Sequence, residues 1–188
     1  RTWTATDVCG NATSVTQIVT VQDTTAPEIT TQASNIEVEC DGSGNTTSLS
    51  SWLASNGGAV ASDNCSSVTW TNNFTSLTDS CGTTPATVIF TATDACGNYS
   101  TSSATFKIKD TTAPTITIVA TDLTVECDGN GNTQALNTWL ASNGGAAATD
   151  VCSSVTWSNN FTSVSDTCGA TGSASVTFTA TDDRGNSA

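Results

Sequence analysis

The eight cysteines are the first residues of this sequence that could do chemistry. None of them forms the close Cys-x-x-Cys type of pair found in zinc sites, and the chain has no histidine, so the pattern disfavours a zinc site. The absence of histidine also excludes a Ser-His-Asp or Cys-His nucleophile. Eight cysteines in an acidic chain are typical of an oxidising, extracellular setting, where they pair as disulfides.

Aspartates in predicted turns and linkers form two sets of three that could bind a cation. The sets are Asp23, Asp63 and Asp94, and, further along the chain, Asp110, Asp150 and Asp182. Three carboxylates that converge without basic partners repel one another unless a cation or water separates them. Calcium, which takes six to eight oxygen ligands, suits such a set. Aspartates also cap turns by accepting backbone hydrogen bonds, so calcium binding and turn capping both stay open.

A second arrangement of oxygen ligands precedes a predicted helix. Asp128, Asn130 and Asn132 occupy alternate positions there, and Asp41, Ser43 and Asn45 are the earlier copy. This is the spacing of the first three ligands of an EF-hand calcium loop, but the twelfth position holds Trp139 or Trp52 instead of glutamate. A tight turn that leads into a helix explains the pattern equally well.

The charge balance excludes several classes of partner. The formal net charge is -13, from 17 acidic and 4 basic side chains, and there is no basic cluster. Nucleic acids and anionic membrane surfaces both require lysine and arginine, so neither is an expected partner. No apolar run approaches the length of a membrane-spanning helix, which disfavours direct membrane insertion. No cofactor is expected apart from the calcium considered above.

An internal repeat of 87 residues organises the chain. Asp23-Thr-Thr-Ala-Pro27 returns at Asp110, and Trp52-Leu-Ala-Ser-Asn-Gly-Gly58 returns at Trp139, both at the same offset. We therefore expect three parts. Residues 1–25 would be the C-terminal hairpin of a truncated repeat with its linker, 26–112 a complete repeat, and 113–188 a repeat that lacks its last strand.

The hydrophobic pattern within the complete repeat predicts short strands and one helix. The expected strands are residues 30–40, 60–62, 68–74 and 87–93, a short one near 75–78, and a final strand that carries Ala104, Phe106 and Ile108. Leu49, Trp52 and Leu53 fall at helical spacing, so residues 48–55 are expected to form a short helix that ends at Asn56-Gly57-Gly58. The predicted fold class is all-β, with tandem immunoglobulin-like sandwiches.

These motifs resemble a known type of surface repeat. The turn Thr91-Ala-Thr-Asp-Ala-Cys-Gly-Asn98, the strand after it and Asp110-Thr-Thr-Ala-Pro114 resemble hyalin-repeat (HYR-like) immunoglobulin-type modules. With the Val-Glu-Cys-Asp-Gly motif at Cys40 and the helix motif at Trp52, the chain is more similar to tandem repeats of Bacteroidota cell-surface adhesins, such as SprB-like gliding-motility adhesins.

The resemblance implies an extracellular protein of the cell surface, exported by type 9 secretion and serving in a filament or stalk for cell adhesion. It also implies that the Asp-Thr-Thr sequence is an O-glycosylation signal, with Thr24 and Thr111 as the candidate acceptors of a glycoprotein. The expected partners are neighbouring repeats of the same polypeptide, and surface glycans or other copies of the filament.

The expected strand order predicts the disulfides. Following the chain up and down a sandwich puts Cys40 and Cys81 at one end and Cys65 and Cys96 at the other, so we predict Cys40–Cys81 and Cys65–Cys96. The same argument predicts Cys127–Cys168. Arg184 occupies the position of Cys96 in the last repeat, so Cys152 is expected to be unpaired, as is Cys9.

Two functions fit these observations. The first is a disulfide-stapled structural repeat of an extracellular filament or adhesin stalk, without catalytic residues. The alternative is a calcium-assisted, lectin-like module that itself binds glycans. Because both copies keep the same linker and turns, the first function is favoured, and the chain is not expected to be an enzyme.

Overall fold

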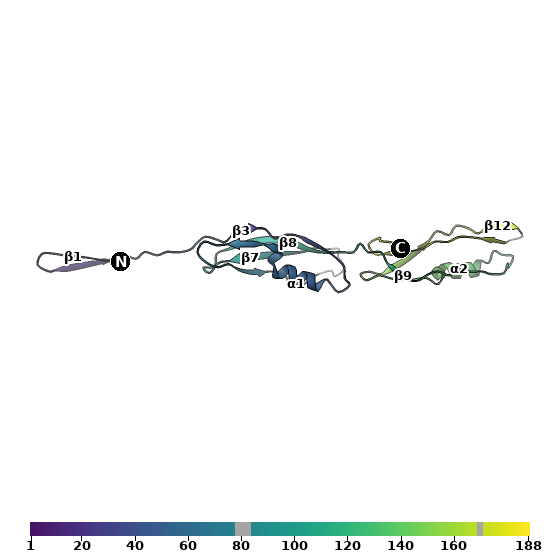
Figure 1. Ribbon diagram of the computed structural model, residues 1–188, viewed down its shortest axis with the longest axis horizontal. Coiled ribbons are helices and arrows are strands. Elements are labelled where there is room, and N and C mark those ends of the chain that lie inside the picture. Colours follow the sequence, from purple (N-terminus) through teal and green to yellow (C-terminus); the bar gives the residue numbers. More distant parts are fainter. Residues whose placement is uncertain (78–83, 169–170) are drawn as a thin grey trace.

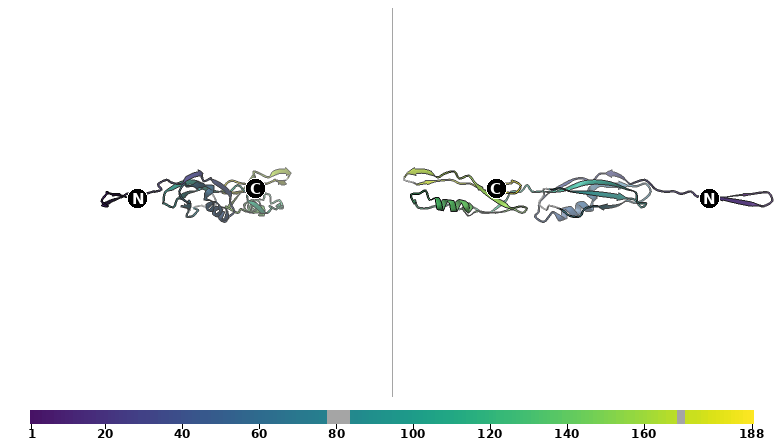
Figure 2. Two further views of the ribbon diagram at one scale, coloured as in Figure 1. Left: turned by 60° about the vertical axis from the view of Figure 1, so that its left-hand side comes forward. Right: turned by 180° about the vertical axis from the view of Figure 1, so that it is seen from behind.

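The chain forms an elongated molecule in which three parts follow one another along a single axis (Figures 1 and 2). The computed structural model describes residues 1–77, 84–168 and 171–188, with side chains left undescribed at 166–168 and 171. Described secondary structure is mostly β, with two short α-helices. The all-β class is therefore confirmed. Neither α-helix in the described part is long and apolar enough to cross a membrane.

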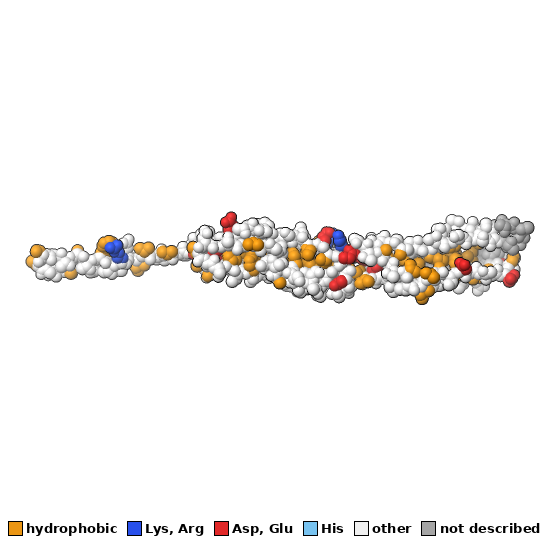
Figure 3. All heavy atoms as spheres, viewed as in Figure 1, with side chains coloured by type: hydrophobic (Ala, Val, Ile, Leu, Met, Phe, Trp, Pro, Cys, Tyr) orange, Lys and Arg blue, Asp and Glu red, His pale blue; other side chains and the backbone are white. Residues whose placement is uncertain are grey.

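The N-terminal part is an isolated hairpin. Strands β1 (Thr2–Thr6) and β2 (Ala12–Thr16) pair antiparallel, and residues 17–27 lead from them to the next part (Figure 1). β2 ends at Thr16, which lies opposite Thr2, and the N–H of Gln17 still donates to the Arg1 carbonyl at 2.8 Å. Apolar side chains of the hairpin and linker, including Val15, Val19 and Val21, are exposed on the surface (Figure 3).

The middle part consists of two β-layers and a helix. Its strands are β3 (Glu28–Thr31), β4 (Ile36–Glu39), β5 (Val60–Ser62), β6 (Thr69–Asn72), β7 (Ala86–Thr93) and β8 (Tyr99–Lys109). One sheet has the order β4-β8-β7-β6, with β4 parallel to β8, and the other pairs β3 with β5. Helix α1 (Thr46–Ala54) and the 3-10 turn η1 (Asn56–Gly58) connect β4 to β5.

Alternate residues of the two longest strands form the core, as their period-two pattern predicts. Val88, Phe90 and Ala92 of β7 are buried, and so are Ala104, Phe106 and Ile108 of β8. Leu49 and Trp52 of α1 cover this face, with the Trp52 ring centroid 5.2 Å from Phe90 and 5.7 Å from Phe106. The predicted helix and core residues are thus confirmed.

The predicted first strand, residues 30–40, is instead two strands in different layers. β3 pairs with β5, whereas β4 pairs with β8. Between them the N–H of Ala33 donates to Ser102 Oγ and the N–H of Ser34 donates to the Gly57 carbonyl, so the chain crosses from one layer to the other. The short strand predicted near 75–78 is absent at residues 75–77, and residue 78 lies outside the described part.

The C-terminal part repeats several elements of the middle part. These are β9 (Thr115–Ile118), α2 (Thr133–Ala141), η2 (Asn143–Gly145), β10 (Ala147–Thr149), β11 (Val155–Asn159), β12 (Ser165–Cys168), β13 (Thr171–Ser173) and β14 (Phe178–Asp182). Trp139 of α2 packs edge-on against Phe178, as Trp52 packs against Phe90. Residues 123–126, which match β4, form no strand, because residues 113–188 contain no counterpart of β8 to pair with them.

Candidate functional site

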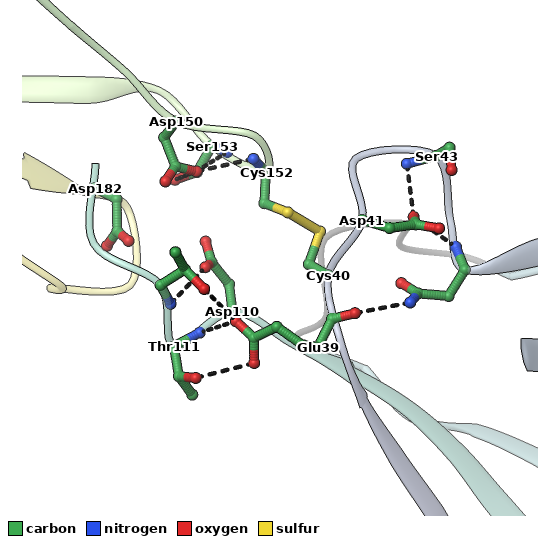
Figure 4. Close-up of a disulfide and its surroundings, with 12 residues drawn as sticks. Glu39, Cys40, Asp41, Ser43, Asp110, Thr111, Asp150, Cys152, Ser153 and Asp182 are labelled. Atoms are coloured by element: carbon green, nitrogen blue, oxygen red, sulfur yellow. Dashed lines mark hydrogen bonds between the residues drawn. A yellow bond between two sulfur atoms is a disulfide. The ribbon is translucent and has the colours of Figure 1, made fainter. Parts of the chain in front are cut away.

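The linker between the middle and C-terminal parts is held by a carboxylate at the end of β4. Glu39 Oε1 accepts a hydrogen bond from the Thr111 N–H at 2.7 Å and one from the Thr112 hydroxyl at 3.0 Å. Its Oε2 accepts one from the Thr111 hydroxyl at 2.9 Å (Figure 4). These donors lower the pKa of Glu39, the Thr111 N–H having the largest effect.

A disulfide crosses the same junction. Cys40, directly after β4, is bonded to Cys152 in the turn between β10 and β11, with their Cα atoms 6.2 Å apart (Figure 4). The N–H of Cys40 continues the β4–β8 ladder by donating to the Lys109 carbonyl, which fixes the end of the strand beside the linker. A disulfide fits an oxidising compartment, such as that of secreted proteins.

This bond corrects two disulfide predictions. Cys40 is paired with Cys152 and not with Cys81, which lies outside the described residues, and Cys152 is not unpaired. The physical reason is the linker: by holding Thr111 and Thr112, Glu39 brings the start of the C-terminal part against the end of β4. The predicted pairing rests on contacts within one repeat, whereas this contact joins two repeats.

A glycine allows the two parts to touch beside the disulfide. Gly42 has φ +71°, and a Cβ added to it would lie 2.8 Å from the Val151 carbonyl oxygen and 2.9 Å from Val151 Cγ1. At the matching position, Gly129 has φ +74° and a Cβ would meet nothing within 4 Å. Gly42 therefore packs directly against the following part of the chain.

Three aspartates from separate segments meet at this junction, as the sequence predicts. Asp110 comes from the linker, Asp150 from the turn after β10 and Asp182 from the end of β14, and one carboxylate oxygen of each lies within 4.8 Å of the others (Figure 4). Asp150 Oδ1 accepts the N–H groups of Cys152 and Ser153. Asp182 is 5% exposed.

The Asp182 carboxylate closes the turn that follows β14. It accepts the N–H groups of Arg184 and Asn186 at 2.8 and 2.9 Å and the Asn186 side-chain amide at 2.7 Å. The same turn recurs at Asp7 and Asp94 with their own asparagines, Asn11 and Asn98. Turn capping therefore accounts for the carboxylates of Asp94 and Asp182, two members of the predicted sets.

Asp110 has a raised pKa and one carboxylate oxygen without a hydrogen-bond partner among the described residues. Burial raises the pKa of Asp110, and the charges of Asp150, Asp182 and Glu39 raise it further, against the lowering effect of the Thr112 N–H. Its Oδ2 exposes less than 1 Å² and has no hydrogen-bond partner among the described residues. Turn capping therefore leaves one buried oxygen of this cluster unexplained.

The preceding linker approaches the middle part in a similar way. Asp23, Asp63 and Cys65 form a close group, in which Cys65 takes the place predicted for Asp94. Asp94 is 5% exposed, and its carboxylate is engaged in its own turn. The Asn98 amide donates to the Asp23 carbonyl at 3.4 Å, just as the Asn186 amide donates to the Asp110 carbonyl at 3.3 Å.

The remaining cysteine predictions have different outcomes. Cys65 and Cys96 are both exposed thiols, so the predicted Cys65–Cys96 bond is absent from the structure. Desolvation raises the pKa of Cys96, and the charges of Asp23, Asp94 and Cys65 raise it further. Cys9 is an exposed thiol, as predicted. Cys127–Cys168 stays a prediction, because the Cys168 side chain lies outside the described part.

The loops before the two helices are tight turns. Asp41 Oδ1 accepts the N–H groups of Ser43 and Asn45, and Asp128 Oδ1 accepts those of Asn130 and Asn132. Neither aspartate belongs to a close acidic group in the described part of the chain. Asn45 and Asn132 adopt φ near +50° and donate their amides to the Glu39 and Glu126 carbonyls. The turn explanation therefore accounts for the carboxylates of both loops, although Asn45 Oδ1 is buried and has no hydrogen-bond partner among the described residues.

The two candidate glycosylation sites differ in their surroundings. Both threonines are exposed. The Thr111 hydroxyl donates to Glu39, whereas at the other linker Asp23 accepts hydrogen bonds from the Thr25 N–H and the Asn98 amide. A glycan on Thr111 would have to replace its hydroxyl hydrogen bond to Glu39.

The sequence interpretation missed Glu39, Gly42 and Val151. The signal for the first two was present, since the Val-Glu-Cys-Asp-Gly motif returns as Val125 to Gly129. The repeat of this motif does not by itself indicate that its glutamate and glycine contact the next linker and the next repeat. A comparison with known protein families finds no matching family model, and a search of curated proteins finds no matching relative.

Proposed function

We propose that this chain is a structural segment of an extracellular filament or adhesin stalk, in which tandem immunoglobulin-like repeats are fixed end to end. The repeats would have no catalytic role, and their partners would be neighbouring repeats. The observation that carries the proposal is the Cys40–Cys152 disulfide, because it joins two successive repeats at their junction. A covalent bond beside a short linker would keep the spacing and the orientation of the two repeats fixed, as a stalk requires.

The contacts around the disulfide support a fixed junction. Glu39 holds two linker residues, Gly42 packs against Val151, and the Asn186 amide donates to the Asp110 carbonyl. These contacts come from both repeats and surround the linker, which contains Pro114. Proline restricts the backbone of a short connection and so stiffens it further.

The strand arrangement of the middle repeat supports the immunoglobulin-like class. Its larger sheet begins with a short strand parallel to the last strand, followed by two antiparallel strands, in the order β4-β8-β7-β6. Leu49 and Trp52 of α1 pack on the core, and β3 and β5 form a second sheet. Extracellular location, export by type 9 secretion and a part in gliding motility belong to the same proposal and rest on the resemblance of the motifs.

NMR relaxation of the 188-residue protein tests whether the junction is fixed. We expect the middle and C-terminal repeats to tumble as one body, and Gly42→Ala to make them tumble separately, because its Cβ would collide with Val151. Gly129→Ala is the matched control: it introduces the same backbone strain at φ +74° without a collision. Independent tumbling of the two repeats in the unaltered, oxidised protein would refute the proposal, and saturable binding to a glycan would favour the lectin-like alternative.

A further inference from the structure

We propose that Asp110, Asp150 and Asp182 bind a divalent cation of the calcium type at the junction between the two repeats. Each residue comes from a different segment, and their carboxylate oxygens lie within 4.8 Å of one another (Figure 4). Calcium takes six to eight oxygen ligands in irregular geometry, so three carboxylates completed by water would satisfy it.

The unpartnered oxygen of Asp110 points to a ligand independently of this clustering. Its Oδ2 exposes less than 1 Å² and accepts no hydrogen bond within the described residues. A buried carboxylate oxygen without a partner loses its hydration and gains nothing in return, so native proteins normally supply a donor, a water or an ion. An ion bound by Asp110 would also lie close to carboxylate oxygens of Asp150 and Asp182.

The same feature recurs at the preceding linker. Asp23, the counterpart of Asp110 in the preceding linker, also has an Oδ2 that exposes less than 1 Å² and lacks a partner in the described part. In both places the linker carbonyl is held by the asparagine of the adjoining turn. A buried oxygen repeated at matching positions is a property of the repeat and not of one local conformation.

The electrostatics of the second junction favour a cation. Its neighbouring Glu39 is a further acidic group, and the two lysines of the chain, Lys107 and Lys109, are both within 3.6 Å of Glu37. Asp150 uses Oδ1 for its two backbone hydrogen bonds, which leaves Oδ2 for a ligand. Three hard oxygen donors suit calcium better than a soft transition metal.

This inference rests on the proposed function in one respect, because both take the junction between the repeats to be the functional part of the chain. A bound ion would neutralise the repulsion among three carboxylates that belong to two repeats and their linker. Calcium would then lock the junction in addition to the disulfide. If calcium does not bind while the two repeats still tumble together, the cation inference fails and the proposed function stands.

Calorimetric titration of the metal-free 188-residue protein with calcium chloride tests the site. We expect saturable binding that Asp110→Asn and Asp150→Asn each weaken at least about tenfold. Asp128→Asn is the control, because Asp128 closes a turn outside the cluster. The absence of saturable binding at millimolar calcium would overturn the inference, as would a loss of binding in the Asp128 variant but not in the other two.

Thermal melting separates a cation site from turn capping even if one variant binds poorly for another reason. Without calcium, Asp110→Asn should melt at a higher temperature than the unaltered protein, because one of three repelling charges is gone. With saturating calcium the order should reverse, since only the unaltered site gains the binding energy. A variant that melts lower in both conditions would show that Asp110 only caps the turn through Thr112 and would refute the proposal.

Discussion

Glu39 is the residue through which one repeat holds the linker to the next. Its carboxylate accepts three hydrogen bonds from Thr111 and Thr112, so the ionised form is favoured and its pKa lies below the ordinary value of 4.5. When the junction opens, these donors leave and the pKa returns toward its ordinary value. The stability that Glu39 contributes is therefore fully present above the ordinary pKa and is lost as the pH falls through the lowered one.

We expect Glu39→Gln to lower the melting temperature at neutral pH and to lose this effect in acid. Glutamine keeps the size of the side chain but cannot offer a charged acceptor to the three donors. Thermal melts followed by circular dichroism at a series of pH values measure the difference between the two proteins. Glu126→Gln is the matched control, because the hydrogen bond described for Glu126 involves its carbonyl oxygen and not its carboxylate. A difference that stays constant down to strongly acidic pH would contradict this role.

The cysteine pairing shows what residue types alone can predict about this structure and what they cannot. The sequence predicted an oxidising setting, which the Cys40–Cys152 disulfide fits, and it identified Cys152 as the cysteine whose within-repeat partner is replaced by Arg184. It could not indicate Cys40 as the new partner, because that choice depends on how the next repeat lies against the end of β4. Contacts between repeats leave no periodic pattern in the sequence of one repeat.

The end of α1 is an element whose geometry depends on a glycine. Gly57 adopts φ +65° in the turn after the helix, and a Cβ there would lie 3.0 Å from the Phe90 ring and 3.1 Å from the Ala33 side chain. Gly144 has the same surroundings after α2, beside Phe178 and Ala120. The missing side chain lets the helix approach the sheet closely enough for Trp52 to reach the core.

Gly57→Ala should destabilise the middle repeat more than Gly58→Ala does. Both positions have positive φ, so both variants incur backbone strain of about 1–2 kcal/mol. Only Gly57 also meets the core, whereas a Cβ at Gly58 would have no neighbour within 4 Å. We expect the difference to be about 1–3 kcal/mol in urea unfolding followed by tryptophan fluorescence. Equal effects of the two substitutions would show that the contact with Phe90 relaxes without cost.

Local patterns predicted most of the elements because each carries its own signal. The helical spacing of Leu49, Trp52 and Leu53 predicted α1, and the alternation in β7 and β8 predicted their buried faces. The crossing at Ala33 and Ser34 was missed because both halves of residues 30–40 have strand composition. Which layer a short strand joins is decided by distant partners, here β5 and β8, that its own residues do not specify.

At the scale of the whole molecule, the sequence indicated the repeat but not the junction. Identical offsets fixed the period, and the aspartates of the second set converge as their place in turns and linkers predicted. The first set was only partly right, since Cys65 stands beside Asp23 and Asp63 where Asp94 was expected. Whether a side chain from one repeat meets the next depends on the angle between them, which Glu39 and the disulfide set.

The disulfide also determines how the molecule would respond to tension. A pull on the two ends of the chain passes through the sulfur bridge from residue 40 to residue 152, so the intervening residues, with β5 to β8, carry no force. Single-molecule stretching should therefore show an oxidised chain that is shorter at full extension by roughly 400 Å, given the bond's sequence separation of 112 residues. Adding a reductant should release this hidden length. A surface filament built in this way would keep most of each repeat folded while it is stretched.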